Sequence, residues 1–130
     1  MVKSLLLVLT SVLVVTACAA ARRAVTAEEV GRQLSGEWSG HFTNTQGTSF
    51  PVTFTITAES RRVTGVGNIP SSQVDQRPKV SGTYESDKVL WNLSSGFTYQ
   101  MRMERDESGT YYLSGPVTGR NAGTMSLTKK

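Results

Sequence analysis

The sequence has very little of the residues that build metal centres and nucleophilic active sites. Its 130 residues contain one cysteine, Cys18, and one histidine, His41. Zinc needs clusters of His, Cys or carboxylate ligands, and a Ser-His-Asp relay needs a histidine beside an exposed nucleophile. Alternation places His41 on the outer face of a strand, and no strained nucleophile turn is present. We therefore expect no enzyme activity, no metal and no cofactor.

Long apolar runs are also scarce. The main one is Leu5–Val15, which follows Lys3 and is interrupted only by Thr10 and Ser11. A helix of this length reaches about 16 Å, roughly half of the hydrocarbon core of a bilayer. The run is too short to span a membrane and is typical of the apolar region of a secretory signal peptide.

The single cysteine lies just after this apolar run, in the stretch Val15-Thr16-Ala17-Cys18. An aliphatic residue, two small residues and a cysteine in this context resemble the lipobox of bacterial lipoproteins. The resemblance implies signal cleavage between Ala17 and Cys18, a diacylglycerol on the Cys18 thiol and an acylated new N-terminus. Residues 1–17 would then be the signal peptide and residues 18–25 the lipidated cysteine with its tether.

An alternative is ordinary secretion, with cleavage within Ala19-Ala20-Ala21. Either route exports the protein and leaves a folded domain without a disulfide. The lipoprotein resemblance implies a bacterial cell envelope location with the membrane as partner through the lipid. Ala19 stands where an aspartate retains some lipoproteins at the inner membrane, so the outer membrane is expected in a cell with two membranes.

Charge does not favour a nucleic-acid partner. The chain has 14 basic and 10 acidic residues, a net charge of +4 and a pI near 9.5. The basic excess is small and scattered, and an exported protein does not meet nucleic acid in its own compartment.

A short helix is predicted after the tether. Thr26-Ala27-Glu28-Glu29 has the form of a capping box, and Val25 and Val30 occupy the two positions of a hydrophobic staple. These signals predict a helix over Ala27–Gln33.

Alternating apolar and polar residues predict strands over the rest of the chain. They cover Glu37–Thr43, Phe50–Thr57, Arg62–Ile69, Lys79–Glu85, Val89–Leu93, Phe97–Glu104, Tyr111–Val117 and Met125–Leu127. The short connections exclude parallel pairing, and closing the first strand onto the last removes both sheet edges. We predict an all-β domain over residues 26–130, a small eight-stranded antiparallel up-and-down barrel. A two-sheet sandwich is the alternative.

The inward positions of these strands predict a packed aromatic core. They carry nine aromatic residues, balanced by glycines on neighbouring strands: Trp38, Phe42, Phe50, Phe54, Tyr84, Trp91, Phe97, Tyr99 and Tyr111. Eight strands enclose a space only just wide enough for side chains to fill. We therefore expect a filled interior rather than a deep cavity.

The start of the first barrel strand, Gly36-Glu37-Trp38, resembles the G-x-W signature of lipocalin and avidin-like barrels. In those families the tryptophan packs at the closed end of an eight-stranded antiparallel barrel. The resemblance implies the same architecture and leaves the ligand open.

A second resemblance is to bacterial lipoprotein inhibitors of lysozyme. Ser81-Gly82-Thr83-Tyr84 is similar to their S-G-x-x-Y motif with one residue fewer, and Trp91 follows at a similar distance. The implied alternative function is inhibition of a cell-wall-degrading enzyme such as lysozyme. The positive charge argues against it, because an inhibitor of a basic enzyme should be acidic.

In an up-and-down barrel, alternate connections lie at opposite ends. One end collects the charged turns around residues 59–62, 85–88 and 105–107, together with the tether. The other collects mostly neutral polar loops, whose candidate ligand residues are Asn44, Gln46, Ser71, Gln73, Ser95 and Asn121. Their amide and hydroxyl groups suit a neutral polar ligand, although ordinary turns use the same residues.

These patterns predict a non-enzymatic binding or interaction module of the envelope, with a neutral polar ligand or an envelope protein as partner. A structural accessory of an envelope complex is a further alternative.

Overall fold

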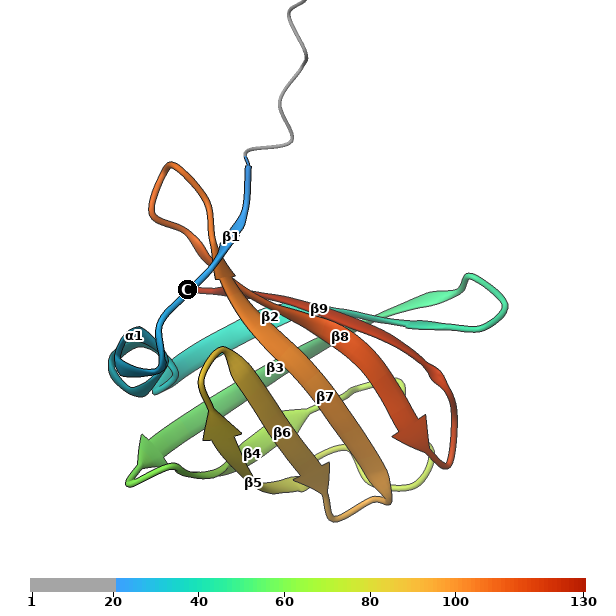
Figure 1. Ribbon diagram of the computed structural model, residues 1–130. Helices are drawn as coiled ribbons and strands as arrows, with labels where there is room; N and C mark the ends of the chain where they lie inside the picture. The colour runs from blue at the N-terminus through green and yellow to red at the C-terminus, as the bar shows by residue number, and fades with distance from the viewer. Residues whose placement is uncertain (1–20) are drawn as a thin grey trace, which may run out of the picture.

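The computed structural model describes residues 21–130 and confirms the all-β prediction (Figure 1). In chain order the elements are β1 (Arg23–Ala24), α1 (Ala27–Gln33), β2 (Gly36–Asn44), β3 (Ser49–Glu59), β4 (Arg62–Asn68), β5 (Lys79–Glu85), β6 (Lys88–Leu93), β7 (Phe97–Arg105), β8 (Tyr111–Gly119) and β9 (Gly123–Lys129). The predicted strands correspond to β2 through β9. The short strand β1 was not predicted.

The sheet closes on itself. Its strand order is β1-β7-β6-β5-β4-β3-β2-β9-β8, and a further pairing of β7 with β8 completes an eight-stranded barrel with β1 as an addition. Every pairing is antiparallel, and β2 pairs with both β3 and β9. The closed barrel is therefore confirmed over the sandwich, and closure satisfies the backbone groups that two sheet edges would expose.

The interior of the barrel is filled by alternate side chains of the strands. Trp38 and Trp91 are fully buried, and the ring of Phe54 lies 5.1 Å from the Trp91 ring between centroids. Large side chains face small ones, as the sequence predicts. A Cβ added to Gly67 would lie 2.7 Å from the Phe54 ring. Most of the stabilising free energy comes from this burial, at about 1.5–3 kcal/mol for each large apolar side chain before entropy is subtracted.

Helix α1 covers one end of the barrel. Its N-cap is Thr26, whose hydroxyl oxygen accepts a 3.2 Å hydrogen bond from the Glu29 amide. Val25 and Val30 are both buried, as expected of a hydrophobic staple. Leu34 follows the helix and is also fully buried. The apolar side of this short helix therefore forms part of the core.

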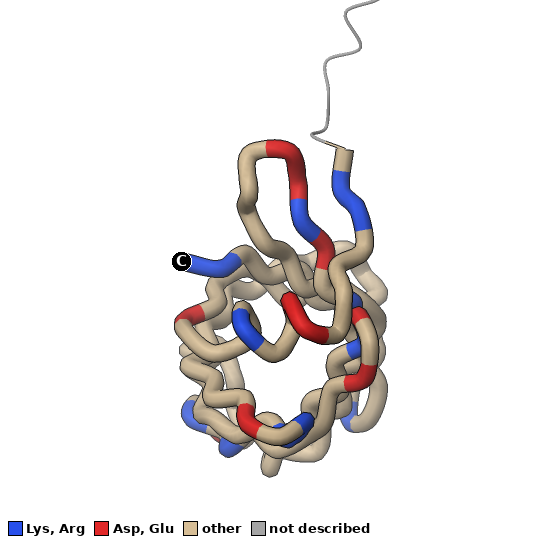
Figure 2. Tube along the Cα trace, turned by 60° about the vertical axis from the view of Figure 1, so that its left-hand side comes forward, with Lys and Arg blue, Asp and Glu red and all other residues tan. Residues whose placement is uncertain are grey.

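The connections between the strands divide between the two ends of the barrel. We call the end that carries α1 the helix end; the turns 59–62, 85–88 and 105–111 also lie there. We call the opposite end the loop end; it carries the loops 44–49, 68–79, 93–97 and 119–123. The hairpin of β7 and β8 projects from the helix end beside the N-terminal segment (Figure 1). Figure 2 shows acidic and basic residues along this hairpin and around the ring of strands.

Candidate functional site

A hollow of about 540 Å³ opens at the loop end of the barrel. Three half-buried aromatic side chains form its floor: Phe42 from β2, Phe50 from β3 and Phe97 from β7. The Phe42 ring stacks on Phe50 with centroids 6.3 Å apart and meets Phe97 edge-on at 6.5 Å. The floor is therefore apolar, and the packing of the rings against one another fixes its shape.

A fully aromatic layer lies beneath this floor. It comprises Phe54, Trp91 and Tyr99, whose ring centroids are 5.1–6.5 Å apart. Burial raises the pKa of the Tyr99 hydroxyl well above its usual range, because the charged phenolate would be poorly solvated there. The hollow is thus a shallow cup at the barrel mouth, closed below by the core.

The walls of the hollow come from the two loops that face each other across it. The β4–β5 loop contributes Ile69 and the run 71–74, and the β8–β9 turn contributes Arg120 and Asn121. Val74 is 58% exposed, which is unusual for a large apolar side chain and adds an apolar surface to the rim.

The β4–β5 loop is held by its own hydrogen bonds. The Ile69 amide donates to the Gln76 carbonyl at 2.8 Å, and the Gln76 side-chain amide donates to the Pro70 carbonyl at 3.2 Å. The Ser72 hydroxyl oxygen accepts from the amides of Val74 and Asp75. This wall is therefore a compact loop with several internal hydrogen bonds, which can present side chains in fixed positions.

Most of the predicted ligand residues gather at this end. Ser71, Gln73 and Asn121 line the hollow, while Asn44 and Gln46 line an adjoining depression of about 260 Å³ that shares Asn121 with it. Asn44 has a structural role, because its side-chain oxygen accepts 3.0 Å hydrogen bonds from the amides of Gln46 and Thr48. It shapes the β2–β3 loop as an Asx turn.

Ser95 does not line either depression. It is 7% exposed in the β6–β7 turn, and its buried hydroxyl has no hydrogen-bond partner among the described residues. Burial in a turn is hard to foresee from the neutral polar stretch Ser94-Ser95-Gly96, because the same residues occur in solvated turns.

Arg120 is the one charged residue of the hollow, and it is not among the ligand residues predicted from the sequence. Its amide donates to the Gly96 carbonyl at 3.2 Å, and its side chain passes so close to Gly96 that a Cβ there would lie 3.2 Å from Nε. Gly96 and Gly119 have φ of +99° and +109°, which favours glycine at both. The contact of the β6–β7 and β8–β9 turns therefore positions Arg120 at the rim.

Arg120 has no acidic partner in the described part of the chain. The ion pairs within residues 21–130 are Arg32–Glu28 and Lys130–Glu37, each at 3.4 Å, and both lie at the helix end. The hollow thus combines an apolar floor, neutral polar walls and one cation whose charge no carboxylate balances. Such a site favours a ligand with both an apolar part and a negative group.

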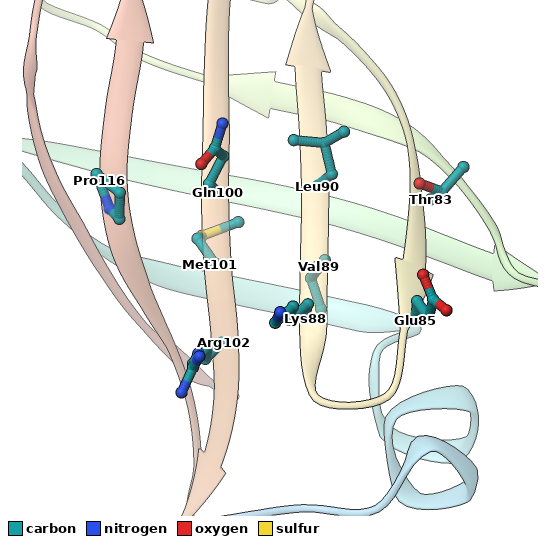
Figure 3. A pocket seen from close by; sticks show the side chains of 9 residues that line it. All are labelled: Thr83, Glu85, Lys88, Val89, Leu90, Gln100, Met101, Arg102 and Pro116. Carbon is teal, nitrogen blue, oxygen red and sulfur yellow. The ribbon is translucent and has the colours of Figure 1, made fainter.

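A second depression of about 490 Å³ lies on the outer wall of the barrel, across β5 to β8 (Figure 3). Pro116 of β8 lines this depression. It has no amide hydrogen, and the β7–β8 ladder beside it lacks paired residues between Tyr99–Val117 and Arg102–Ser114. The lining of the depression includes charges of both signs, Glu85 with Lys88 and Arg102. It contains none of the predicted ligand residues and no aromatic side chain, so the loop-end hollow is the stronger candidate.

A separate polar cluster stabilises the hairpin at the helix end. Asp106 is buried, and its Oδ1 accepts from the Ser108 hydroxyl at 2.6 Å and from the amides of Ser108 and Thr110. Its Oδ2 accepts from the Tyr112 hydroxyl at 2.8 Å. These hydrogen bonds, chiefly those from the Ser108 and Tyr112 side chains, lower the pKa of Asp106 to about 2.

The residues that resemble the motif of lysozyme inhibitors lie in the wall and the core of the barrel. Ser81, Gly82 and Tyr84 belong to β5, where a Cβ on Gly82 would overlap the Leu90 carbonyl of β6. Trp91 is in the core. The stretch that resembles lysozyme inhibitors is therefore part of the barrel wall, where glycine allows close strand contact.

The predicted signal peptide and lipidation site precede residue 21, where the described part of the chain begins. The signal peptide (residues 1–17), Cys18 and the cleavage point between Ala17 and Cys18 lie outside the described residues. Within residues 21–130, no helix is both long and apolar enough to cross a bilayer. In the same range, no three His, Cys, Asp or Glu side chains are grouped as metal ligands. His41 is exposed on the outer face of β2, and the non-enzymatic function stays a prediction.

Known proteins offer no match. No model of a protein family, no curated protein sequence and no solved structure matches the chain. A functional assignment therefore depends on the residues of this chain.

Proposed function

We propose that this protein is a lipid-anchored lipoprotein of the bacterial cell envelope that binds a small amphipathic ligand in the loop-end hollow. The observation that carries the ligand proposal is the position of Arg120 above an apolar aromatic floor, with no carboxylate beside it. The expected ligand places its apolar part on Phe42, Phe50 and Phe97 and a carboxylate or phosphate at Arg120. Ser71, Gln73 and Asn121 are available for further hydrogen bonds at the rim.

The chemistry of each part supports this ligand class. Half-exposed phenyl rings gain free energy by burial against a ligand, at about 25 cal/mol per Å² of apolar surface removed from water. A guanidinium forms charge-assisted, often bidentate hydrogen bonds with carboxylate and phosphate oxygens. This adds a negative group to the neutral polar ligand that the loop composition alone predicts.

The anchor proposal is supported by the Val15-Thr16-Ala17-Cys18 stretch after a charged and then apolar leader. The chain enters the barrel at the helix end, so the hollow at the loop end faces away from the anchor. Two or more acyl chains on one residue hold a protein stably at a membrane, whereas a single chain does so only marginally.

Titration calorimetry with decanoate and decanol tests the ligand proposal, using the protein in lipid nanodiscs with empty nanodiscs as the blank. We expect decanoate to bind more tightly than decanol, and Arg120→Gln to weaken decanoate alone by roughly 10-fold, the loss of a hydrogen bond to a charged group. Arg77→Gln is the matched control, because Arg77 is an exposed arginine of the same end that does not line the hollow. Equal binding of decanoate to wild type and Arg120→Gln would contradict the proposed role of Arg120.

The intact mass of the membrane-extracted protein tests the anchor. We expect a chain that begins at Cys18 and carries the added mass of its acyl groups. A free thiol on Cys18, or an N-terminus beyond it, would overturn the anchor proposal and leave the calorimetric result unaffected.

A further inference from the structure

The segment just after Ala21 is bound to the barrel. Arg23 and Ala24 form β1, which pairs with Arg105 and Glu104 at the far end of β7. The guanidinium carbon of Arg22 lies 3.7 Å from the centroid of the Tyr112 ring, within the range of a cation–π contact. Val25 then enters the core. The chain is therefore attached to the folded domain from Arg22 onward.

The hairpin that receives this segment is itself fixed. The Tyr112 hydroxyl donates to Asp106, whose other oxygen is held by the turn residues Ser108 and Thr110. On the neighbouring side, the Tyr111 hydroxyl donates to the Glu29 carboxylate of α1 at 3.2 Å. Contacts on both sides of the β7–β8 hairpin thus hold it in place. Arg22 contacts Tyr112 of the same hairpin and so attaches the segment before α1 to it.

The distance from this attachment to Cys18 is short. Only four peptide units separate Cys18 from Arg22. Fully extended, they span at most about 14 Å. A lipid on Cys18 would therefore enter the bilayer close to the β7–β8 hairpin, which projects beside β1 in both views (Figures 1 and 2).

We infer that the helix end is a membrane-contacting surface whose partner is the phospholipid headgroup layer that holds the anchor. This inference rests on the proposed lipidation of Cys18. The β7–β8 hairpin, residues 105–111, meets the headgroups first. The contacts of Arg22 and β1 limit the rotation of the barrel relative to the membrane. The exposed Arg23 beside the hairpin is placed to bind headgroup phosphates. The loop-end hollow is thereby held away from the membrane on the opposite side of the barrel.

Fluorescence quenching by headgroup-labelled lipids tests this orientation. The described domain has no cysteine, and a lipidated Cys18 has no free thiol, so an introduced cysteine takes a single fluorophore. Glu107→Cys places it on the exposed hairpin tip, and Thr45→Cys places it on an exposed residue of the loop end. In proteoliposomes carrying nitroxide-headgroup lipids, we expect quenching at position 107 to exceed that at position 45 several-fold.

An insertion of about ten Gly and Ser residues after Ala21 is the matched control, because it lengthens the link and leaves the barrel sequence intact. It should bring the quenching at the two positions closer together. Equal quenching at positions 107 and 45 in the anchored parent protein would overturn the orientation alone. A protein that does not float with the liposomes would overturn both the orientation and the anchor.

Hydrogen exchange of the same purified protein supplies a second readout. The amides of β1 should exchange more slowly than those of a solvated linker, and Arg22→Ala should accelerate them while circular dichroism shows an unchanged barrel. Linker-like exchange of β1 in the parent protein would contradict the attachment of the N-terminal segment to the barrel.

Discussion

The indole N–H of Trp38 donates a 2.8 Å hydrogen bond to the backbone carbonyl of Leu34. Both residues are fully buried, one on the first barrel strand and the other directly after α1. The hydrogen bond satisfies a carbonyl at the end of a short helix that lacks an intrahelical partner. It therefore joins the helix to the barrel wall at the helix end.

Replacement of the two buried tryptophans by phenylalanine should show what this hydrogen bond contributes. Trp38→Phe leaves the Leu34 carbonyl without its partner, whereas Trp91→Phe removes an indole N–H that has no partner within residues 21–130. We expect Trp38→Phe to lower the free energy of unfolding by about 1–3 kcal/mol more than Trp91→Phe does. Urea denaturation of both variants measures the difference, and equal losses would contradict this role of the hydrogen bond.

Stability should depend on pH in the acid range through Asp106. Its pKa is about 2 in the folded protein and 3.8 in an unperturbed side chain, so the folded state favours the carboxylate. The stabilisation is complete above pH ~4 and is lost as the pH falls from about 4 toward 2. Denaturation midpoints measured across this range should fall less steeply in Asp106→Asn than in wild type. Parallel curves would show that Asp106 does not contribute to the acid sensitivity.

Two tight turns at the helix end contain non-glycine residues in left-handed conformations. Ser60 and Arg61 have φ of 50° and 65° in the β3–β4 turn, and Ser86 has φ of 55° in the β5–β6 turn. Glycine is favoured at such positions. Arg61→Gly and Ser86→Gly should each raise the free energy of unfolding by about 1 kcal/mol.

Asp87→Gly is the control for this prediction, because its φ is not positive. It should lower stability by about 0.5–1 kcal/mol through the entropy of the unfolded chain. Thermal unfolding of the three variants gives the signs directly. A stabilising Asp87→Gly would show that the gain does not come from the backbone conformation.

The contact of Gly67 with Phe54 should appear as energetic coupling. Gly67→Ala places a methyl group 2.7 Å from the Phe54 ring and should cost about 1–3 kcal/mol, because neighbouring strands leave little room for the ring to move. Phe54→Leu removes the opposing ring edge, so the double variant should be more stable than the two single losses predict. A double-mutant cycle measures this coupling, and additive losses would argue against the contact.

The sequence predicts those parts of the fold that depend on local pattern. The capping box at Thr26–Glu29 and the staple residues predict the start of α1, and alternation predicts β2 through β9. Barrel closure follows from the short connections and the need to pair both edges. Strand β1 has two residues and no alternation, because it exists only through its pairing with the projecting end of β7.

Part of the candidate site could be predicted from the sequence. Loop order along the chain places Asn44, Ser71, Gln73 and Asn121 at one end. The position of Arg120 at the rim of the hollow depends on the contact of the β6–β7 and β8–β9 turns, which no local pattern encodes. Likewise, the Arg22–Tyr112 contact joins residues 90 positions apart in sequence. Side chains that meet only after the barrel closes need the three-dimensional structure to be recognised.

The pairing of β2 with β9 also sets the order in which the domain can form. The first strand of the barrel pairs along its length with residues 123–129, which follow every other barrel strand in the sequence. Contacts between residues so distant in sequence form slowly, since a long loop must close before they stabilise the chain. During synthesis, β2 and β3 can form a hairpin early, but the barrel cannot close until β9 has left the ribosome.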